Sequence, residues 1–490
     1  MDDIDPLSCY RALLARDRRF DGVFFTCVRT TGIYCRPICP ARPPKLENCR
    51  FVATASAAQE AGFRACLRCR PDAAPESPAW RGTSTTVARA LRMISDGALD
   101  DGSVSKLAGR LGVGERHLRR LFVDHLGASP LTVALTRRIL LAKQLVHDSD
   151  LSMIEIAAAS GFSSLRRFNE TFRDQFGRPP SALRQRAARS KGGPQLTILL
   201  PYRVPYDWDA MLAFLKTRAI PCVEQVESGV YSRTFEVDGQ RGLIYVADEP
   251  DICALKARIQ VGDLSMVTRI VARLKRLFDT DSDPQAINHV LGQDDLLAPL
   301  VERRPGLRLP GAWDGFELGV RAILGQQISV AAASSLAGRL AQVYGVPLAA
   351  PVDGLNRYFP STERLAGLDI ENAGFPRARA KAVVEFARAI DSDTALLDGG
   401  VPFSEAIARL KAVYGIGVWT SDYIAMRALK ESNAFPRGDA ALARIARGAG
   451  LQGGNKDLEQ RSETWRPWRA YGVMHLWTAD MEARRDAIAA

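Results

Sequence analysis

The spacing of apolar residues predicts helices through the middle of the chain, in two stretches of the same design. In SVSKLAGRLGVGERHLRRLFVDHLG (103–127), apolar residues recur at helical spacing on both sides of the break Gly112-Val113-Gly114. LSMIEIAAASGFSSLRRFNETFRDQFG (151–177) repeats this arrangement around Gly161. A helix, a tight turn with glycine and a second helix that carries an arginine pair form the helix-turn-helix pattern. Two such units in series indicate a DNA-binding region.

Beyond residue 195 the pattern starts with strands and passes into helices. QLTILLPYRVPYDWDAMLAFLKTRAI (195–220) begins with β-prone residues and continues with helical spacing. VYSRTFEVDGQRGLIYVA (230–247) holds two strand-like runs around Asp238-Gly239, which is a hairpin signal. From about residue 265 the spacing is helical to the end. We therefore expect a small antiparallel sheet followed by an all-helical body.

Two stretches without periodicity divide the chain into segments. RPDAAPESPAWRGTS (70–84) is rich in Pro, Ala and Ser, and RAARSKGGPQ (186–195) joins a basic run to Gly-Gly-Pro. Both are predicted to be linkers. Because 490 residues are too many for one hydrophobic core, we expect separate segments at about 1–75, 84–187 and 195–490.

Composition and charge narrow the class of protein. No apolar run approaches the ~18–20 residues of a membrane span, and the acidic start MDDIDPLSCY does not have the pattern of a signal peptide. We therefore expect a cytoplasmic protein with no membrane partner, in which structural disulfides are rare. Residues 1–190 contain 30 Lys and Arg against 19 Asp and Glu, whereas residues 191–490 contain 36 of each. This basic excess fits either a solubilising surface or a polyanionic partner such as nucleic acid.

Four of the nine cysteines form two close pairs, Cys35/Cys39 and Cys66/Cys69, with 26 residues between the pairs. This is the spacing of a four-thiolate zinc site, and unrelated buried cysteines are the alternative. The other five show no such pairing and are expected to be small core residues: Cys9, Cys27, Cys49, Cys222 and Cys253.

The cysteine motifs VRTTGIYCRPICPAR and AGFRACLRCRPD resemble the N-terminal domain of the Ada family of adaptive-response regulators, over about Leu7 to Asp72. The resemblance implies that the four cysteines bind zinc and that Cys35 accepts a methyl group from DNA methylphosphotriesters. A zinc-bound sulfur stays a thiolate, which is the nucleophilic form. Methylation also removes one negative charge from the site, so we expect methylated protein to bind promoter DNA more tightly.

The two helix-turn-helix units resemble the AraC-type DNA-binding domain, including its ending FRDQFGRPPSALR (172–184). The resemblance implies promoter DNA as a partner, and RNA polymerase as a further one. We expect a monomer. The expected DNA-contacting residues of the second helices are Arg116, Arg119, Arg120, Arg166 and Arg167.

The last segment resembles the AlkA-type 3-methyladenine DNA glycosylase along its whole length. The resemblance is carried by YDWDAMLAFLKTRAI, RPGLRLPGAWDGFELGVRAILGQQISVA, YGIGVWTSDYIAMRAL and WRPWRAYGVMHLW. Familiar Ada regulators end instead in an alkylguanine transferase with a Pro-Cys-His-Arg motif, which this sequence does not contain, so we expect that activity to be absent.

YGIGVWTSDY (414–423) resembles the hairpin of a helix-hairpin-helix unit, in which Gly415 and Gly417 would expose backbone N–H groups to a DNA phosphate. Asp439, twenty residues after Trp419, stands where the family keeps its catalytic aspartate. An aspartate there could instead cap a helix. An ionised Asp439 would stabilise the positive charge that develops on the sugar and would orient or deprotonate water.

The resemblance further implies a monofunctional enzyme with an aromatic base pocket. Bifunctional relatives place a lysine in the hairpin where this chain has Trp419, so we expect a hydrolase that leaves the abasic site uncut. Trp419, Tyr423 and Trp477 match the family's pocket, in which π-faces favour a flipped cationic base, although each could be a core aromatic. Gln327 stands where the best-known member inserts a leucine wedge, and it is expected to fill the gap in the duplex. Gln326, Trp465 and Trp468 are interpreted as scaffold.

The sequence thus predicts a mainly α, multidomain protein. We expect a small α/β zinc domain (1–75), an all-α double helix-turn-helix domain (84–187), a glycosylase sheet subdomain (195–280) and a helix-hairpin-helix body (281–490). The predicted function is DNA alkylation repair and its regulation, combining base excision, methyl transfer and methylation-activated transcription. Two alternatives stay open: a regulator with a catalytically idle glycosylase body, and a glycosylase whose N-terminal modules only target DNA.

Overall fold

The computed structural model describes residues 5–66, 68–69, 71, 85–100, 102–184, 195–352, 354–368, 375–393, 396–397 and 401–489. The predicted linkers 70–84 and 186–195 lie almost entirely outside these residues. Contacts group the chain into two compact units. One comprises residues 1–204, 237–242 and 248–272, and the other comprises residues 205–236, 243–247 and 273–490.

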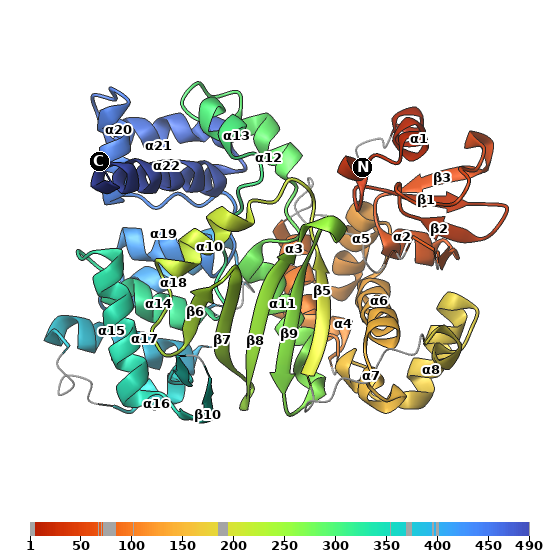
Figure 1. The fold of residues 1–490 in the computed structure, drawn as a ribbon, viewed down its shortest axis with the longest axis horizontal. Helices are drawn as coiled ribbons and strands as arrows, with labels where there is room; N and C mark the ends of the chain where they lie inside the picture. Colours follow the sequence, from red (N-terminus) through yellow and green to blue (C-terminus); the bar gives the residue numbers. More distant parts are fainter. Residues whose placement is uncertain are drawn as a thin grey trace. The chain divides into compact units, whose positions relative to one another are not determined.

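The N-terminal region is a small α/β domain, as predicted (Figure 1). Its elements are α1 (Pro6–Ala15), β1 (Phe25–Val28), β2 (Ile33–Cys35), β3 (Cys49–Val52), α2 (Ala55–Glu60) and β4 (Arg64–Ala65). The strand order is β3-β1-β2-β4, and β2 runs parallel to β4 with Tyr34 opposite Ala65. Because Cys35 follows Tyr34 and Cys66 follows Ala65, this pairing brings the two cysteine motifs together.

The next region is helical throughout its described residues and contains both predicted helix-turn-helix pairs. Its helices are α3 (Thr85–Ser95), α4 (Val104–Arg110), α5 (Glu115–Leu126), α6 (Pro130–Asp148), α7 (Met153–Ala159), α8 (Leu165–Phe176) and α9 (Pro180–Leu183). Gly112 and Gly161 adopt left-handed backbone conformations in the two turns, with φ of +71° and +78°. Leu118, Phe122 and Phe168 are completely buried, as the apolar spacing predicts.

A five-stranded sheet follows, with the order β5-β9-β8-β7-β6. Its strands are β5 (Gln195–Pro201), β6 (Glu224–Glu227), β7 (Val230–Val237), β8 (Gln240–Glu249) and β9 (Ala254–Val261), and α10 (Trp208–Lys216) lies between β5 and β6 in the chain. The predicted hairpin turn joins β7 to β8, and Asp238 and Gly239 there have φ of +49° and +76°. Two successive positive φ values are those of a type I′ turn, whose twist matches that of the strands.

The described residues of the C-terminal body are helical apart from one short hairpin and the connecting loops. Its helices are α11 (Val267–Phe278), α12 (Pro284–Leu291), α13 (Ala298–Arg303), α14 (Gly315–Leu324), α15 (Val330–Tyr344), α16 (Thr362–Ala366), α17 (Arg377–Ser392), α18 (Phe403–Ala412), α19 (Val418–Arg427), α20 (Ala440–Gly448), α21 (Asn455–Arg461) and α22 (Arg469–Ala489). The strands β10 (Pro347–Val352) and β11 (Leu355–Arg357) were not expected. β10 contains two prolines and no alternation of buried and exposed residues, so it gives no strand signal.

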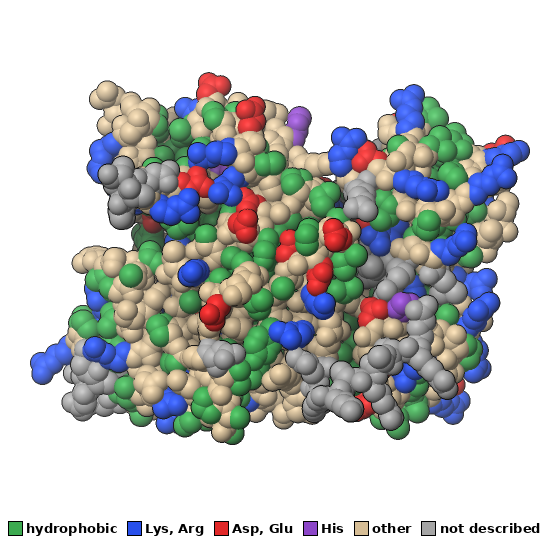
Figure 2. Space-filling model, in the orientation of Figure 1, with side chains coloured by type: hydrophobic (Ala, Val, Ile, Leu, Met, Phe, Trp, Pro, Cys, Tyr) green, Lys and Arg blue, Asp and Glu red, His purple; other side chains and the backbone are tan. Residues whose placement is uncertain are grey.

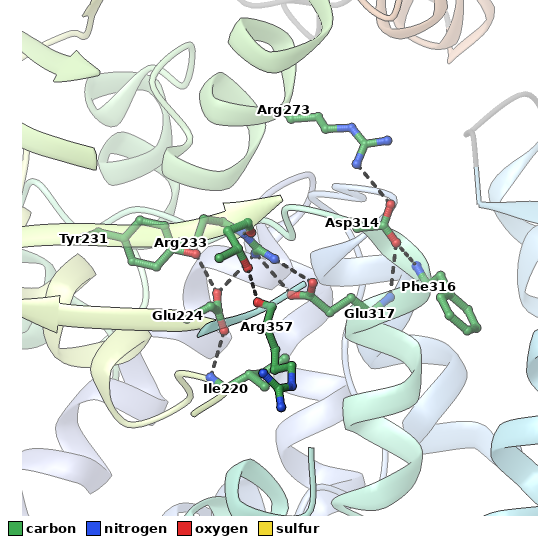
Figure 3. A network of polar contacts seen from close by, with 10 residues as sticks. Ile220, Glu224, Tyr231, Arg233, Arg273, Asp314, Phe316, Glu317 and Arg357 are labelled. Carbon is green, nitrogen blue, oxygen red and sulfur yellow. Dashed lines mark hydrogen bonds and ion pairs between the residues drawn. The ribbon is translucent and has the colours of Figure 1, made fainter. Parts of the chain in front are cut away.

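A buried network of charged groups joins strand β7 to helix α14 (Figure 3). The side chain of Arg233 is only 2% exposed, and its Nη1 and Nη2 donate to Oε1 and Oε2 of Glu317 at 3.1 and 2.6 Å. Glu224 accepts a further bond from Arg233 Nη1 at 3.3 Å and one from the Tyr231 hydroxyl at 2.6 Å. The Arg233 guanidinium also lies 5.2 Å from the ring centroid of Trp313. Every charge in this group therefore has a partner.

None of the helices in the described part of the chain is long and apolar enough to cross a membrane.

We expect Glu317→Gln to destabilise this unit by about 3–5 kcal/mol, because it leaves the buried Arg233 charge partly uncompensated. The measurement is the urea midpoint followed by tryptophan fluorescence. The matched control is Glu385→Gln, which breaks an exposed ion pair with Arg388 and should change stability by less than about 1 kcal/mol. Equal losses of stability from the two substitutions would contradict the conclusion that Glu317 compensates the buried charge of Arg233.

Candidate functional sites

The four cysteine sulfurs of the N-terminal domain form one group, with all Sγ atoms within 4.8 Å of one another. Four thiolates around Zn²⁺ at the usual Zn–S length would be about 3.8 Å apart, so a small contraction of the group completes a tetrahedral site. Cys39, Cys66 and Cys69 are buried, while Cys35 is partly exposed. The chemistry and spacing of these donors fit zinc, whose bound thiolates stay deprotonated at neutral pH.

The four sulfurs differ in their hydrogen bonds. The backbone N–H of Arg36 donates to Cys69 Sγ at 3.3 Å. Because an N–H donor withdraws electron density from a thiolate, this bond attenuates the sulfur of Cys69. Cys35 is the one member of the group that is partly exposed.

Arg36, between the first two cysteines, is anchored by its side chain. Its Nε donates to Asp21 Oδ1 at 2.8 Å, and its Nη1 donates to the carbonyl of Cys69 at 3.1 Å. The guanidinium and the carboxylate of Asp21 are both about nine-tenths buried. This ion pair therefore fixes the backbone from which the Arg36 N–H reaches Cys69.

The arginines expected to contact DNA lie on the second helix of each helix-turn-helix pair. Arg116, Arg119 and Arg120 are on α5, and Arg166 and Arg167 are on α8. Arg119 pairs with Glu115 at 2.8 Å and Arg166 with Glu170 at 2.9 Å, both one helical turn away. Such exposed pairs are weak, so these guanidinium groups can exchange a carboxylate for a DNA phosphate. Figure 2 shows further Lys and Arg side chains spread over the domain of α1 and β1–β3, at the upper right.

The predicted hairpin precedes α19. Gly415 has φ of +82°, and a Cβ there would lie 2.4 Å from the Cβ of Ala382 on α17. Only glycine fits this combination of left-handed backbone and close approach. Gly417 is the N-cap of α19 and has no side chain to cover the first-turn N–H groups. The exposed helix start is thus open to an anion.

Asp439 lies at the start of α20 and binds groups from three helices. Its Oδ1 accepts from the backbone N–H groups of Ala441 and Leu442, each at 3.0 Å, as an N-cap does. Oδ1 also accepts from Trp477 Nε1 on α22 at 3.1 Å, and Oδ2 accepts from Trp419 Nε1 on α19 at 2.9 Å. The carboxylate is 8% exposed. Oδ1 has three donors and Oδ2 has one, so Oδ2 retains a free lone pair for a substrate or water.

The three expected pocket aromatics surround this carboxylate. The rings of Trp419 and Tyr423 stack with centroids 5.2 Å apart and planes 12° apart. Trp477 is tilted against Tyr423, with centroids 6.2 Å apart. The structure therefore brings Asp439, Trp419, Tyr423 and Trp477 together. Asp439 also caps α20, and the three aromatic rings also pack against one another, so the two alternative interpretations are compatible with this grouping.

Three arginines lie behind Tyr423, and the sequence analysis did not single them out. Arg427 Nη1 donates to the Tyr423 hydroxyl at 2.7 Å, and Arg321 and Arg218 add their positive charges. Burial acts to raise the pKa of the Tyr423 phenol, but these charges outweigh burial and lower that pKa to about 8. Arg321 on α14 and Arg427 on α19 stand among buried residues of their helices, whereas Arg218 follows the end of α10. For Arg321 and Arg427, an arginine within a buried apolar stripe was the available signal.

Two residues from GQQISV lie on the loop between α14 and α15. Gln327 is exposed and has φ of +57°. Gln326 contacts the hairpin through its Nε2, which donates to the Gly415 carbonyl at 2.8 Å.

The other two residues interpreted as scaffold are Trp465 and Trp468. Trp465 donates from Nε1 to Asp294 at 2.9 Å, and Trp468 is buried against Tyr471. The two tryptophans thus pack within the helical body, whereas Gln326 touches the hairpin of the candidate site.

Four family models match successive parts of the chain. They are the metal binding domain of Ada (8–72), a helix-turn-helix domain (107–186), the AlkA N-terminal domain (197–314) and the HhH-GPD superfamily of base excision DNA repair proteins (320–470).

Curated relatives match the whole chain or its C-terminal part. The probable bifunctional transcriptional activator/DNA repair enzyme AlkA of Mycobacterium tuberculosis is 41% identical over 96% of this chain and 95% of its own length. DNA-3-methyladenine glycosylase 2 of Escherichia coli is 36% identical over 57% of this chain and 95% of its own length. The solved 3-methyladenine DNA-glycosylase of Archaeoglobus fulgidus shares the fold over 58% of this chain and 98% of its own, with a TM-score of 0.50 and 23% identity.

We expect the Tyr423 hydroxyl to titrate with a midpoint near pH 8, about two units below an ordinary tyrosine, because three guanidinium groups stabilise the phenolate. The measurement is the phenolate absorbance of the folded protein, and Tyr423→Phe should remove that early step. Tyr414→Phe, at a half-exposed hairpin tyrosine, should leave it. Because the pKa of Tyr423 is lower in the folded than in the unfolded protein, the wild type should gain stability over Tyr423→Phe as pH rises from 8 towards 10. If the wild type and Tyr423→Phe show the same tyrosine titration, the lowered pKa of Tyr423 is contradicted.

Proposed function

Because the chain belongs to the family of bifunctional transcriptional activators and DNA repair enzymes of the AlkA type, we propose how its residues divide the work. The family combines a zinc-binding methylphosphotriester-DNA methyltransferase, a helix-turn-helix transcription regulator and a 3-methyladenine DNA glycosylase. We assign methyl transfer to residues 1–75, promoter binding to 84–187, and base excision to 195–490, with a sheet subdomain (195–280) and a helix-hairpin-helix body (281–490).

We propose Asp439 as the catalytic carboxylate of base excision. The observation that carries this assignment is the convergence of two pocket indoles and a helix N-terminus on one carboxylate. These donors hold the charged form in one orientation before substrate arrives, so the negative charge needs no rearrangement when positive charge develops at C1′. Oδ2 then faces the sugar or accepts a proton from the attacking water. The bond from C1′ to the base nitrogen breaks, and the electron pair leaves with the base.

The damaged base is proposed to be an N-alkylated purine flipped from the duplex. Its positive charge makes it a good leaving group and favours contact with the π-faces of Trp419 and Trp477. Tyr423 contributes as a cation acceptor most strongly when its phenol is ionised, because the three adjacent guanidinium groups would otherwise oppose a cationic base. Trp419 stands at the position where lyases carry lysine, so we propose that the abasic site is left uncut.

Methyl transfer is assigned to Cys35. Its thiolate attacks the methyl carbon of a DNA methylphosphotriester, a C–S bond forms, and the C–O bond breaks. The methyl group becomes part of a thioether, and the electron pair stays on the phosphate oxygen to restore the phosphodiester anion. Cys35, Cys39, Cys66 and Cys69 would hold the zinc ion, which would keep these sulfurs deprotonated. The partial exposure of Cys35, beside three buried sulfurs, supports Cys35 as the acceptor.

We propose that methylation of Cys35 raises affinity for promoter DNA, because the loss of one negative charge weakens repulsion from phosphate. A direct contact between the domains supports this coupling. Gln59 on α2 is bonded to the Tyr34 hydroxyl at 3.0 Å and to the Thr136 hydroxyl of α6 at 2.7 Å, and Tyr34 precedes Cys35. We further propose a cytoplasmic monomer that acts on alkylated DNA and promoter DNA and meets RNA polymerase at the promoter.

Asp439→Asn is expected to lower the single-turnover excision rate on methylated duplex DNA at least about 100-fold, because asparagine still caps α20 but lacks the charge. Alkali-induced strand breaks measure the abasic product. The control is Asp283→Asn, the same substitution at the N-cap of α12, which should excise like wild type. Similar rates for Asp439→Asn and wild type would support the alternative of an idle glycosylase body.

The acceptor is tested on the wild-type protein. After incubation with methylphosphotriester DNA and digestion, mass spectrometry should find one methyl group on the peptide that contains Cys35 and none on Cys39, Cys66 or Cys69. Cys35→Ser should remove the transfer, and Cys253→Ser, outside the cysteine group, should retain it. Methyl on another member of the group would overturn the assignment. Unchanged promoter affinity after methylation would favour a glycosylase that is only targeted by its N-terminal modules.

A further inference from the structure

The loop between α14 and α15 holds a side chain in a costly conformation. Gln327 is not glycine, yet its φ of +57° lies in the left-handed region, where an ordinary residue is less stable by roughly 1–2 kcal/mol. Its side chain is exposed. Neighbouring contacts must therefore hold the loop in this conformation.

Gln326 supplies these contacts through both its backbone and its side chain. Its carbonyl accepts from Arg379 Nη2 on α17 at 2.7 Å. Its side-chain Nε2 donates to the Gly415 carbonyl at 2.8 Å and to the Thr420 hydroxyl at 3.0 Å. The residue just before Gln327 is thus tied to α17, to the hairpin and to the first turn of α19.

Helix α17 supports the hairpin from the same face. Ala382, three residues after Arg379, lies so close to Gly415 that a Cβ there would be 2.4 Å away. The Lys381 ammonium lies 4.6 Å from the ring centroid of Tyr414 and is exposed, where a DNA phosphate can also reach it. The first turns of α17 therefore contact both the loop of Gln327 and the hairpin.

We propose that Gln326 and Arg379 are positioning residues that fix the wedge side chain of Gln327 relative to the phosphate-binding hairpin. This inference rests on the proposed roles of Gln327 and the hairpin. Base flipping needs the backbone to be held and the vacated space to be filled at the same nucleotide. A shift of about 1 Å between the two would uncouple these events and slow the reaction by one to two orders of magnitude. Neither residue needs to touch the base.

Gln326→Glu tests the proposal with a side chain of the same size that cannot donate to the Gly415 carbonyl. Single-turnover excision of an N-alkylated purine from a fully paired duplex should fall about tenfold or more. The same lesion placed opposite an abasic site should be excised within about twofold of the wild-type rate, because the stack is already open there. Arg379→Ala should give the same difference between substrates, and it keeps the test valid if Gln326→Glu folds poorly. An equal loss on both substrates indicates general damage and overturns the proposal.

The matched control is Arg388→Ala. Arg388 is also on α17 and donates from Nε to the carbonyl of Ala366 at 3.2 Å, but it lies about 14 Å further along the helix. The Arg388→Ala protein should excise the lesion from both substrates at the wild-type rate. A selective loss with Arg388→Ala would show that any disturbance of α17 has this effect, and would overturn the proposal.

A double-mutant cycle separates the inference from the function on which it rests. In a Gln327→Ala background, Gln326→Glu should add less than about twofold, since there is no wedge left to position. If the rate losses of the two single substitutions multiply in the double mutant, the inference is overturned. If Gln327→Ala alone excises the paired lesion at the wild-type rate, the wedge role is wrong and the inference falls with it. If Gln327→Ala is slow while Gln326→Glu is not, only the inference is wrong.

Discussion

Four N–H groups converge on the carboxylate of Asp439, and the arrangement of the proposed excision site depends on this convergence. Two come from the first turn of α20, one from Trp419 on α19 and one from Trp477 on α22. The carboxylate thereby sets the start of one helix and the orientation of two pocket rings. The structural role and the proposed catalytic role coincide, because the donors that fix the helices also keep the charge in place. An asparagine could still cap α20 with its oxygen, but its amide nitrogen could not accept from Trp419 and it would lack the charge.

The charges behind the pocket refine the idea of a cation-selective site. Arg321 and Arg427, which are buried, and Arg218, which is partly buried, line one cavity with Arg233 and Glu317 of the network in Figure 3. Positive charge so close to Tyr423 would oppose a cationic base unless the phenol is ionised. In the proposed pocket, selectivity would therefore depend on a balance between π-faces, a titrating phenol and fixed guanidinium groups, and not on aromatic rings alone. This balance makes the pocket sensitive to pH in a way that tryptophans by themselves cannot produce.

The sequence predicted the elements well wherever local periodicity and turn chemistry agreed. The helix-turn-helix pairs, the Asp238-Gly239 hairpin and the cysteine pairs all carry such signals, and the family motifs brought Asp439 and the aromatics into one site. The contacts of Gln326 and Arg379 could not be predicted, because they join a loop to a helix more than 50 residues away through hydrogen bonds that leave no period in the sequence. The strand β10 escaped prediction because two prolines interrupt its pattern, and β11 is only three residues long. Arg321 and Arg427 could be noticed only as arginines within apolar helix stripes, and Arg218, which follows α10, carries no such signal.

The cysteine group and Asp439 lie in different compact units of the chain. With Cys35 as the proposed acceptor and Asp439 as the proposed catalytic carboxylate, the first site is consumed by one event, since nothing in the transfer regenerates the thiolate, whereas the second turns over. A molecule that has spent its sulfur would still carry an intact excision site. The population of chains would then act as a cumulative dosimeter for phosphate alkylation, while its capacity to clear damaged bases would not decline as the record grows.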